Sequence, residues 1–204
     1  MFPMPERPEE TIAELISLVQ GMGKRELIKP GAIIPSDGPC IIISYEGEVE
    51  LRRKSDELLL FSSENNQLIG LPMNYTYQQF CYLRANSICD IELVDRDIFF
   101  QLVEKNHRWL DVLEVLSFYH AVLLWRDSYA HTKSSYLMVR HLLLQINLLP
   151  EEKRHSINIT EFIQERTNLS RSYIMKVLSD LKLGGYITLK KGRLIELNHL
   201  PAKY

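Results

Sequence analysis

The sequence predicts an α+β protein with an N-terminal β-roll, a long helix and a C-terminal winged helix-turn-helix. Three observations lead to this prediction. Short β-rich runs recur between residues 27 and 94, an apolar helical stretch follows from Trp109 to about residue 131, and the last fifty residues alternate two short helical patterns with two strands. We place the boundaries of the three parts at residues 1–108, 109–132 and 133–204.

The N-terminal part begins with a predicted helix over residues 9–20, whose apolar stripe is Ile12, Leu15, Ile16 and Val19. The helix is expected to end at Gly21. Several β-rich segments follow, separated by turn-forming pairs: AIIP, CIIISYEGEVELRR, LLLFSS, QLIGL, FCYLRA and SICDIELV. Many short strands with turns between them are typical of a β-roll or jelly-roll-like barrel. The segment DRDIFFQLVEKN then predicts a short exit helix.

The long helical stretch carries an imperfect heptad pattern. Positions d would hold Trp109, Leu116, Leu123 and Ala130, and positions a would hold Leu113, His120 and Asp127. We interpret this helix as a dimerisation helix, since a helix-turn-helix protein usually reads two half-sites. The alternative is a helix that packs on its own barrel. A further helix is expected over residues 136–149, with Leu137, Leu144 and Leu148 packing on the C-terminal part, and the segment LLPEEKRHS is expected to be a surface linker.

The C-terminal stretch from Asn158 to Leu197 has the order of a helix-turn-helix. Asn158 or Thr160 can cap its first helix. Asn168 falls where the turn is expected to need a left-handed residue, and Ser170 can cap the second helix.

The second helix is expected to have one apolar face and one polar face. The apolar face is Ile174, Val177, Leu178 and Leu181, and the opposite face is Arg171, Ser172, Met175 and Lys176. Gly184 and Gly185 should end this helix. Two strands then follow over residues 186–190 and 193–197, joined by a turn at Lys191-Gly192, which completes a wing.

Charge is distributed unevenly along the chain. The whole chain has 24 basic and 26 acidic residues, a formal net charge of −2. From Arg154 to the end there are nine basic and four acidic residues, which gives +5 and leaves −7 for the preceding part. A basic module on an acidic body suits contact with phosphates at one end only, which favours double-stranded DNA as a partner. The alternative is a winged helix that serves protein contacts and carries a solvated charged face.

Composition excludes several other classes of protein. A hydrophobic fraction of 46% and a charged fraction of 25% are ordinary for a soluble globular protein of 204 residues. No apolar run is long enough for a membrane helix, and the N-terminus lacks a signal-peptide pattern, so a cytoplasmic protein is expected. The three cysteines are too few and too widely spaced for a disulfide framework or metal knuckle. No catalytic spacing stands out, so we expect neither an enzyme nor a cofactor.

The order of β-roll, long helix and winged helix resembles the superfamily of the cyclic-AMP receptor protein and the fumarate-nitrate reduction regulator. The segments GEVEL and ELVDRDIFFQLVEKN resemble its roll and exit helix, and NLSRSYIMKVLSDLKLGGYI resembles its helix-turn-helix. The stretch from RTNLSRSYIMK to the end is similar to a branch named for inhibition of hydrogen peroxide resistance in enteric bacteria. The resemblance implies a homodimeric transcription regulator on double-stranded DNA, with RNA polymerase a further candidate partner. The branch implies a role in stress, and specifically oxidative-stress, gene control.

In that superfamily a Ser-Arg-Glu-x-x-x-Arg stretch opens the DNA-reading helix. Here Ser170 and Arg171 match, Ser172 replaces the Glu and Lys176 replaces the second Arg. Arg171 can still bind a guanine with two hydrogen bonds, whereas Ser172 and Lys176 change the other contacts, so the operator should differ. We expect the bases to be contacted by Arg171, Ser172 and Lys176. Phosphates are expected to be contacted by Thr160, Ser170 and Tyr173. The wing is expected to contact the DNA backbone through Lys190, Lys191 and Arg193.

The resemblance implies a cyclic-nucleotide pocket in the roll, but the residues for it are altered. The superfamily has Gly-Glu for the ribose, whereas this chain has Gly70-Leu71. It also has an Arg for the cyclic phosphate, whereas YTYQQFCYL has none and Arg84 comes too late. A buried phosphate without a cation is costly, so cyclic AMP binding is not expected. The iron-sulfur variant needs clustered N-terminal cysteines, and none lies before Cys40.

Two smaller groups of residues remain. Cys81 and Cys89 could form a redox pair on neighbouring strands, although two buried small side chains are the more common case. A cluster of aromatic residues could line an effector pocket, although such runs are more often barrel core and rim: Tyr75, Tyr77, Phe80 and Tyr82.

Overall fold

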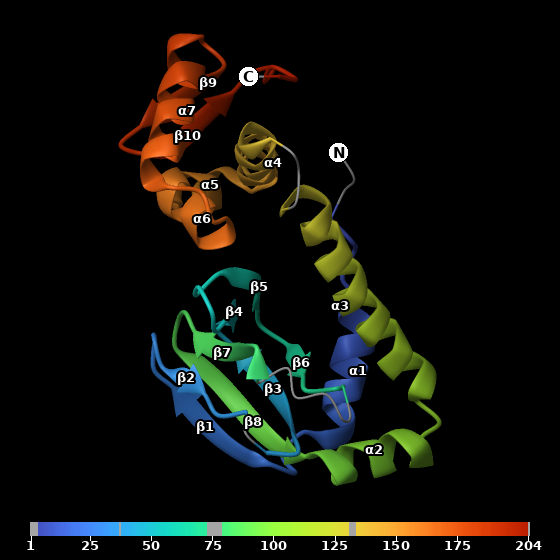
Figure 1. Ribbon diagram of the computed structural model, residues 1–204. Coiled ribbons are helices and arrows are strands. Elements are labelled where there is room, and N and C mark those ends of the chain that lie inside the picture. The colour runs from blue at the N-terminus through green and yellow to red at the C-terminus, as the bar shows by residue number, and fades with distance from the viewer. Residues whose placement is uncertain (1–3, 37, 73–78, 131–133, 204) are drawn as a thin grey trace. The chain divides into compact units, whose positions relative to one another are not determined.

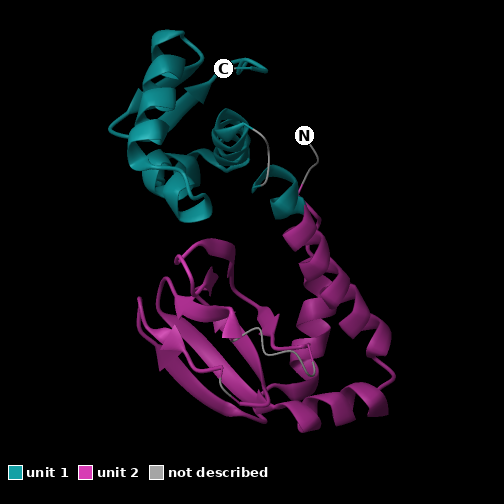
Figure 2. Cartoon of the chain, in the orientation of Figure 1, with its two compact units in different colours: residues 1–3, 125–204 teal, residues 4–124 magenta. Residues whose placement is uncertain are grey.

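The computed structural model describes residues 4–36, 38–72, 79–130 and 134–203, and these form two compact units (Figures 1 and 2). The N-terminal unit is Met4–Leu124, and the other unit contains Trp125–Tyr204. The division falls within one long helix, α3 (Trp109–Ala130).

The N-terminal unit contains two four-stranded antiparallel sheets after a first helix, α1 (Glu9–Val19), so the predicted α+β roll is confirmed. One sheet has the strand order β1-β8-β3-β6 and the other has the order β2-β7-β4-β5. The bounds are β1 Lys24–Ile28, β2 Ile33–Ile34, β3 Cys40–Glu46, β4 Glu48–Arg53, β5 Leu59–Glu64, β6 Gln67–Ile69, β7 Cys81–Ala85 and β8 Cys89–Asp95.

Apolar side chains are buried on both faces of the first sheet, which explains why β3 has an unbroken apolar run rather than an alternating one. Ile42 faces the second sheet and packs with Val49 and Leu83. Ile41 and Ile43 face the opposite way and pack in a cluster with α1, α2 and α3. Side chains alternate between the two faces of a strand, so these three consecutive isoleucines join two separate cores.

Helix α2 (Arg96–Lys105) leads from the roll into α3. The carboxylate of Asp95 caps it, accepting from the backbone N–H groups of Asp97 and Ile98 at 2.8 and 3.2 Å. Trp109, the first residue of α3, stacks on Phe100 of α2 with ring centroids 5.4 Å apart. These contacts fix the start of α3 on the N-terminal unit.

The buried Glu92 on β8 anchors the turn between α1 and β1. Its carboxylate accepts from the backbone N–H groups of Gly21 and Gly23 at 3.1 and 2.6 Å, and from the hydroxyl of Tyr45 at 2.6 Å. Burial raises the pKa of this carboxyl, but the three hydrogen bonds and the charge of Arg25 together hold the pKa below its ordinary value. The carboxylate therefore stays charged and keeps all three donors.

The predicted a and d positions of α3 do not form one continuous seam. Leu116 packs into the core of the N-terminal unit and Trp109 stacks on Phe100, so these two predicted d positions face their own unit. The predicted a positions Leu113, His120 and Asp127 are exposed. Six of the exposed residues on α3 recur at alternating intervals of three and four and define what we call the α3 stripe: Leu110, Leu113, Ser117, His120, Leu124 and Asp127.

The C-terminal unit contains four more helices and a two-stranded wing around one apolar core. The bounds are α4 Ser135–Leu148, α5 Glu151–Ser156, α6 Ile159–Arg166, α7 Arg171–Leu183, β9 Ile187–Lys190 and β10 Arg193–Leu197. On α4, Leu137 and Leu144 pack against the core as predicted, but Leu148 is 78% exposed, which corrects that prediction. The stretch predicted as a plain linker contains α5, which has Glu151 and Glu152 in its first turn, where the helix dipole favours acids.

Candidate nucleic-acid interface

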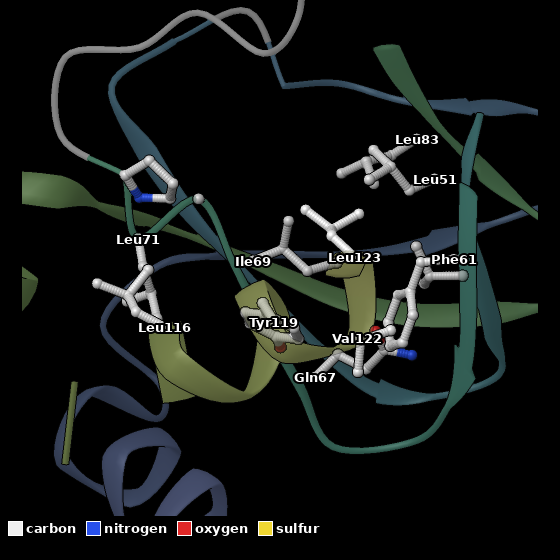
Figure 3. Close-up of a pocket in the computed structure, with 13 residues that line it drawn as sticks. Leu51, Phe61, Gln67, Ile69, Leu71, Leu83, Leu116, Tyr119, Val122 and Leu123 are labelled. Carbon is white, nitrogen blue, oxygen red and sulfur yellow. The ribbon is translucent and has the colours of Figure 1, made fainter. Parts of the chain in front are cut away.

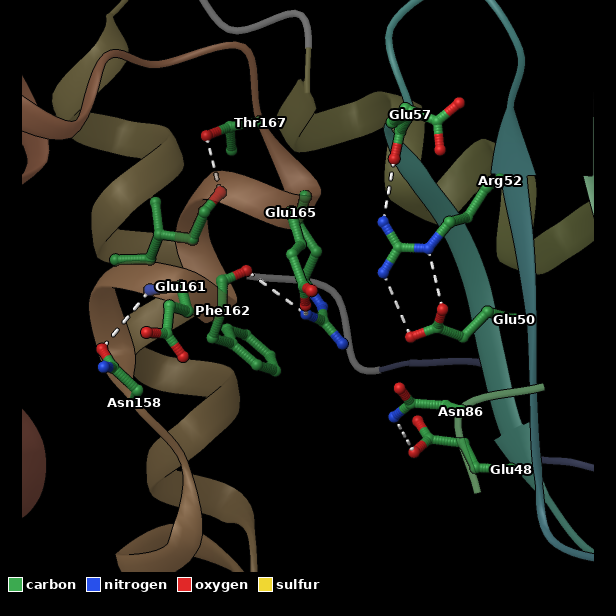
Figure 4. A network of polar contacts seen from close by, with 12 residues as sticks. Glu48, Glu50, Arg52, Glu57, Asn86, Asn158, Glu161, Phe162, Glu165 and Thr167 are labelled. Atoms are coloured by element: carbon green, nitrogen blue, oxygen red, sulfur yellow. Dashed lines mark hydrogen bonds and ion pairs between the residues drawn. The ribbon is translucent and has the colours of Figure 1, made fainter. Parts of the chain in front are cut away.

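The first helix of the helix-turn-helix, α6, starts as predicted at Asn158. The side-chain oxygen of Asn158 accepts from the backbone N–H of Thr160 at 3.1 Å. It also accepts from the backbone N–H of Glu161 at 3.4 Å (Figure 4). The backbone N–H of Ile159 donates to the carbonyl of Gly192 in the wing turn at 3.0 Å. The wing turn is thereby tied to the start of α6, so that the two elements hold each other in place.

The turn between α6 and α7 differs from the prediction. Asn168 is not among the described residues with positive φ, so a left-handed Asn does not make this turn. The buried Thr167 holds it instead: its hydroxyl donates to the carbonyl of Ile163 at 2.7 Å and accepts from the backbone N–H of Leu169 at 3.4 Å. A threonine hydroxyl can replace backbone hydrogen bonds in this way. The sequence signal for this role is a Thr directly before an expected turn.

The second helix, α7, has the predicted cap and the predicted faces. The hydroxyl of Ser170 accepts from the backbone N–H of Tyr173 at 3.3 Å. The buried face is Ile174, Val177, Leu178 and Leu181, and the exposed residues of the first two turns are Arg171, Ser172, Met175 and Lys176. The helix ends at Leu183, with Gly184 as its cap and Gly185 at a φ of +72°.

The exposed Arg171 is oriented by a residue that the sequence analysis did not single out. Its guanidinium donates to the side-chain oxygen of Gln164, on α6, at 3.3 Å. An exposed arginine otherwise samples many rotamers, and ordering it on binding costs free energy. Gln164 therefore favours a conformation of Arg171 in which the guanidinium reaches toward α6. A polar residue near the end of α6 was the only sequence signal for it.

The side chains of Thr160 and Tyr173 pack within the C-terminal unit instead of facing solvent, where a phosphate would bind. Thr160 is only 5% exposed and its hydroxyl donates to the sulfur of Met175 at 3.4 Å, so its predicted phosphate contact is wrong. Burial of the short Thr160 side chain joins α6 to α7 instead. Tyr173 is partly buried and packs against the core of the unit. Ser170 uses its hydroxyl oxygen for the helix cap.

The wing has the predicted two-residue turn. Lys191 and Gly192 both have positive φ, 50° and 76°, which is the requirement of the tight turns that join twisted antiparallel strands. Lys190 pairs with Arg193 across the turn, and both are exposed, as is Lys191. Ile187 and Leu194 are buried and fix the wing on the core. The three basic side chains thus lie together at the tip of a held hairpin.

The structure does not bring Cys81 and Cys89 together. Cys81 pairs with Arg53 at one end of β4, whereas the thiol of Cys89 donates to the carbonyl of Glu48 at the other end, 3.3 Å away. Five residues of strand separate the two ends, about 16 Å, and a disulfide needs Cα atoms within about 7 Å. Burial raises the pKa of both thiols, which lowers their reactivity. Their pairing would need a rearranged roll.

The predicted aromatic effector pocket is not assembled from the residues that can be placed. Tyr75 and Tyr77 lie outside the described residues. Phe80 is 70% exposed, and the hydroxyl of Tyr82 donates to the carboxylate of Glu57.

Among the described residues, no three His, Cys, Asp or Glu side chains are grouped so that they could hold a metal ion. The helices formed by the described residues are too short or too polar to span a membrane.

The comparisons with known proteins agree with this geometry. Residues 135–202 match the family described as winged helix-turn-helix DNA binding. Over 163 residues the chain is 31% identical to the inhibitor of hydrogen peroxide resistance of Escherichia coli strain K12, covering 79% of this chain and 78% of the relative. The protein of that name from Salmonella typhimurium has the same identity and coverage.

Solved structures share the whole fold at low sequence identity. The c-di-GMP-responsive global regulator of Xanthomonas campestris has a TM-score of 0.72 and 14% identity, covering 92% of this chain and 100% of that one. A CRP/FNR-family transcriptional regulator from Thermus thermophilus has a TM-score of 0.61 and 19% identity, covering 85% and 94%. The chain therefore belongs to the family of the inhibitor of hydrogen peroxide resistance; it has the fold of CRP/FNR proteins, and its C-terminal part matches the DNA-binding winged helix-turn-helix family.

Proposed function

We propose that this regulator reads a specific operator through the start of α7. The observation that carries the proposal is the exposed group Arg171, Ser172 and Lys176 on the first two turns, opposite a fully buried apolar face. In a helix-turn-helix, the N-terminal residues of the second helix reach base edges in the major groove. Arg171 would bind a guanine through two hydrogen bonds, and Lys176 and Ser172 would contact neighbouring bases.

The wing would contact the phosphate backbone. Lys190, Lys191 and Arg193 are exposed at the hairpin tip, and the tie between Gly192 and Ile159 keeps that tip beside α6. Phosphate contacts set the position of a protein on DNA without reading the sequence. In this proposal, α7 provides the sequence specificity and the wing provides much of the salt-dependent affinity.

Binding to duplex DNA is expected to weaken steeply with salt, and the wing lysines should account for part of that slope. In Lys190→Gln/Lys191→Gln, the slope of log affinity against log salt should fall by roughly 2, about one for each lost phosphate contact. The measurement is fluorescence anisotropy on a labelled duplex at several salt concentrations. Lys24→Gln/Lys29→Gln, which removes two exposed lysines from the roll, is the matched control. Salt-independent binding, or no duplex binding at all, would favour a winged helix that serves protein contacts or ligand sensing.

We further propose that two copies bind one operator through the α3 stripe. Leu110, Leu113 and Leu124 are 77%, 55% and 58% exposed, and large exposed apolar rows on one helix mark interaction surfaces. The row follows the spacing of a coiled-coil seam. A two-fold dimer would present two winged helices to two half-sites, which supplies the affinity that one short helix lacks.

The genes under control are proposed to include those of hydrogen peroxide defence, because relatives that are 31% identical over 163 residues are named for inhibition of hydrogen peroxide resistance. Genome-wide mapping of the tagged protein, with and without peroxide, would locate its sites. The expected result is that bound promoters are enriched for peroxide-defence genes and share one motif with two half-sites. Bound promoters unrelated to peroxide defence would contradict the assignment of genes but leave the operator model standing.

A further inference from the structure

A cavity of about 210 Å³ lies within the N-terminal unit, and its walls come from the second sheet, the β6 segment and α3 (Figure 3). Leu51 and Leu83 line it from β4 and β7, and Phe61 lines it from β5. Leu116, Tyr119, Val122 and Leu123 line it from α3. The strand residues that face the cavity alternate with polar neighbours, so Tyr82 and Arg84 lie on the other face of the sheet from Leu83.

None of the thirteen described residues that line this cavity carries a charge. The two with polar side-chain groups already use them within the protein. The amide of Gln67 donates to the carbonyl of Ser63, and the hydroxyl of Tyr119 donates to the carbonyl of Leu68 at 3.0 Å. Burial raises the pKa of Tyr119 to about 12, so its hydroxyl remains neutral at physiological pH. A charged occupant would therefore lose its hydration without gaining an ionic partner, which is costly.

The Gly70-Leu71 sequence forms part of this apolar wall. Gly70 has a φ of +101°, and a Cβ there would lie 2.7 Å from the carbonyl oxygen of Cys40, so only glycine fits. The side chain of Leu71 is 2% exposed and packs into the core beside the cavity. Arg84 donates to the carboxylate of Glu50 at 3.0 Å and is committed to that ion pair. No described cation faces the cavity to hold a phosphate.

We propose that this cavity is a binding site for a small uncharged hydrophobic molecule, such as a single substituted aromatic ring or a short acyl chain. An apolar cavity of about 150 Å³ in a protein core is known to bind benzene, so 210 Å³ corresponds to roughly eight non-hydrogen atoms. The rings of Phe61 and Tyr119 meet edge to face with centroids 6.0 Å apart, which provides an aromatic wall. A cyclic nucleotide, with its purine, ribose and charged phosphate, is both larger and of the wrong chemistry.

A molecule in this cavity would touch the same helix that carries the α3 stripe. Leu123 lines the cavity, and its neighbour Leu124 belongs to the stripe. Binding can shift a conformational equilibrium only through contacts that differ between states, and four of the residues that line the cavity belong to α3. A molecule bound in the cavity is therefore placed to affect the dimer proposed to form through α3. Its binding to the cavity can be measured without DNA.

The test uses two ring compounds of similar size, uncharged 4-fluorotoluene and anionic 4-fluorobenzoate, with the full-length protein and no DNA. Fluorine NMR titration should give an affinity for 4-fluorotoluene at least about tenfold higher than for 4-fluorobenzoate, because the cavity cannot compensate a buried carboxylate. Absence of 4-fluorotoluene binding, or equal binding of both compounds, would overturn the proposal. Since DNA is absent, neither result depends on the operator model.

One substitution in the lining and one matched control outside it then locate the bound probe. Leu123→Trp should fill the cavity and weaken 4-fluorotoluene binding at least about tenfold, because Leu123 is a lining residue. Leu27→Trp, at a more exposed position on β1, outside both the lining and the α3 stripe, should leave the affinity within about twofold. Both sites are exposed enough that the fold should tolerate the larger side chain, and circular dichroism checks this. Unchanged probe affinity in Leu123→Trp, with the fold intact, would place the probe elsewhere and overturn the proposal.

Discussion

Replacing Arg171 with alanine is expected to weaken operator binding by ~1–3 kcal/mol and to relax specificity at one base position. Arg171 is exposed at the first position of α7, and its guanidinium donates to the side-chain oxygen of Gln164, on α6, at 3.3 Å. Loss of a two-hydrogen-bond contact to guanine removes the discrimination at that base. Anisotropy titrations on the operator and on a set of single-base variants measure both effects.

The control for Arg171 is a basic residue at the far end of the same helix. Lys182→Ala removes one exposed positive charge from the last turn of α7, away from the residues that face bases, and should leave the base preference unchanged. Gln164→Ala should weaken operator binding less than Arg171→Ala and keep the same preference, because Gln164 positions the arginine without contacting the base. Equal affinity and equal preference in Arg171→Ala and the wild-type protein would contradict the assignment of Arg171.

The parts of the fold that depend on local pattern could be predicted from the sequence. The apolar spacing of Ile174, Val177, Leu178 and Leu181 places one face of α7 inward, and the structure buries these four residues. The Lys191-Gly192 pair predicts a tight turn because glycine allows positive φ, and both residues have it. Asn158 and Ser170 cap α6 and α7 as their residue types suggest. In these cases the physical cause lies within a few residues along the chain.

The prediction failed where a hydroxyl group had two chemically reasonable partners. Thr160 could face solvent or the neighbouring helix, and only the packing of α6 on α7 buries it against Met175. Thr167, not Asn168, holds the turn, because its buried hydroxyl bonds a backbone carbonyl of α6 and the backbone N–H of Leu169 in the turn. Side-chain hydrogen bonds of this kind depend on tertiary neighbours, which a single sequence does not specify.

The cavity and the phase of α3 could not be predicted for a related reason. The helix is apolar around most of its circumference, so a heptad pattern fits it in more than one phase. Contact with the roll decides the phase, since Leu116 packs into the core and Leu113 remains exposed. The cavity joins side chains from β4, β5, β7 and α3 that are far apart in sequence. Leu71 alone gave a sequence signal, as an apolar residue where the resemblance implied an acid.

Introducing a charge into the α3 stripe is expected to separate the proposed dimer. In a parallel two-fold pair, the same position of both helices meets at the seam, so Leu113→Glu would bring two carboxylates together and remove two buried leucines. Leu113 is 55% exposed in the single chain, so the substitution should not disturb the core of its own unit. Sedimentation equilibrium should show a monomer at concentrations where the wild-type protein is a dimer.

The same variant should also lose roughly 10²-fold or more of its affinity for an operator with two half-sites. The two winged helices would no longer be linked, so binding of one would not raise the effective concentration of the other. Its affinity for an isolated half-site should match that of the wild-type protein, since Arg171 and the wing are untouched. Leu148→Glu, which alters an exposed leucine outside the stripe, controls for loss of a surface apolar residue. A Leu113→Glu protein that sediments as a dimer and binds the full operator normally would show that α3 does not form the interface. The exposed leucines would then need another partner, because a row of apolar side chains on one helix is rarely left to water.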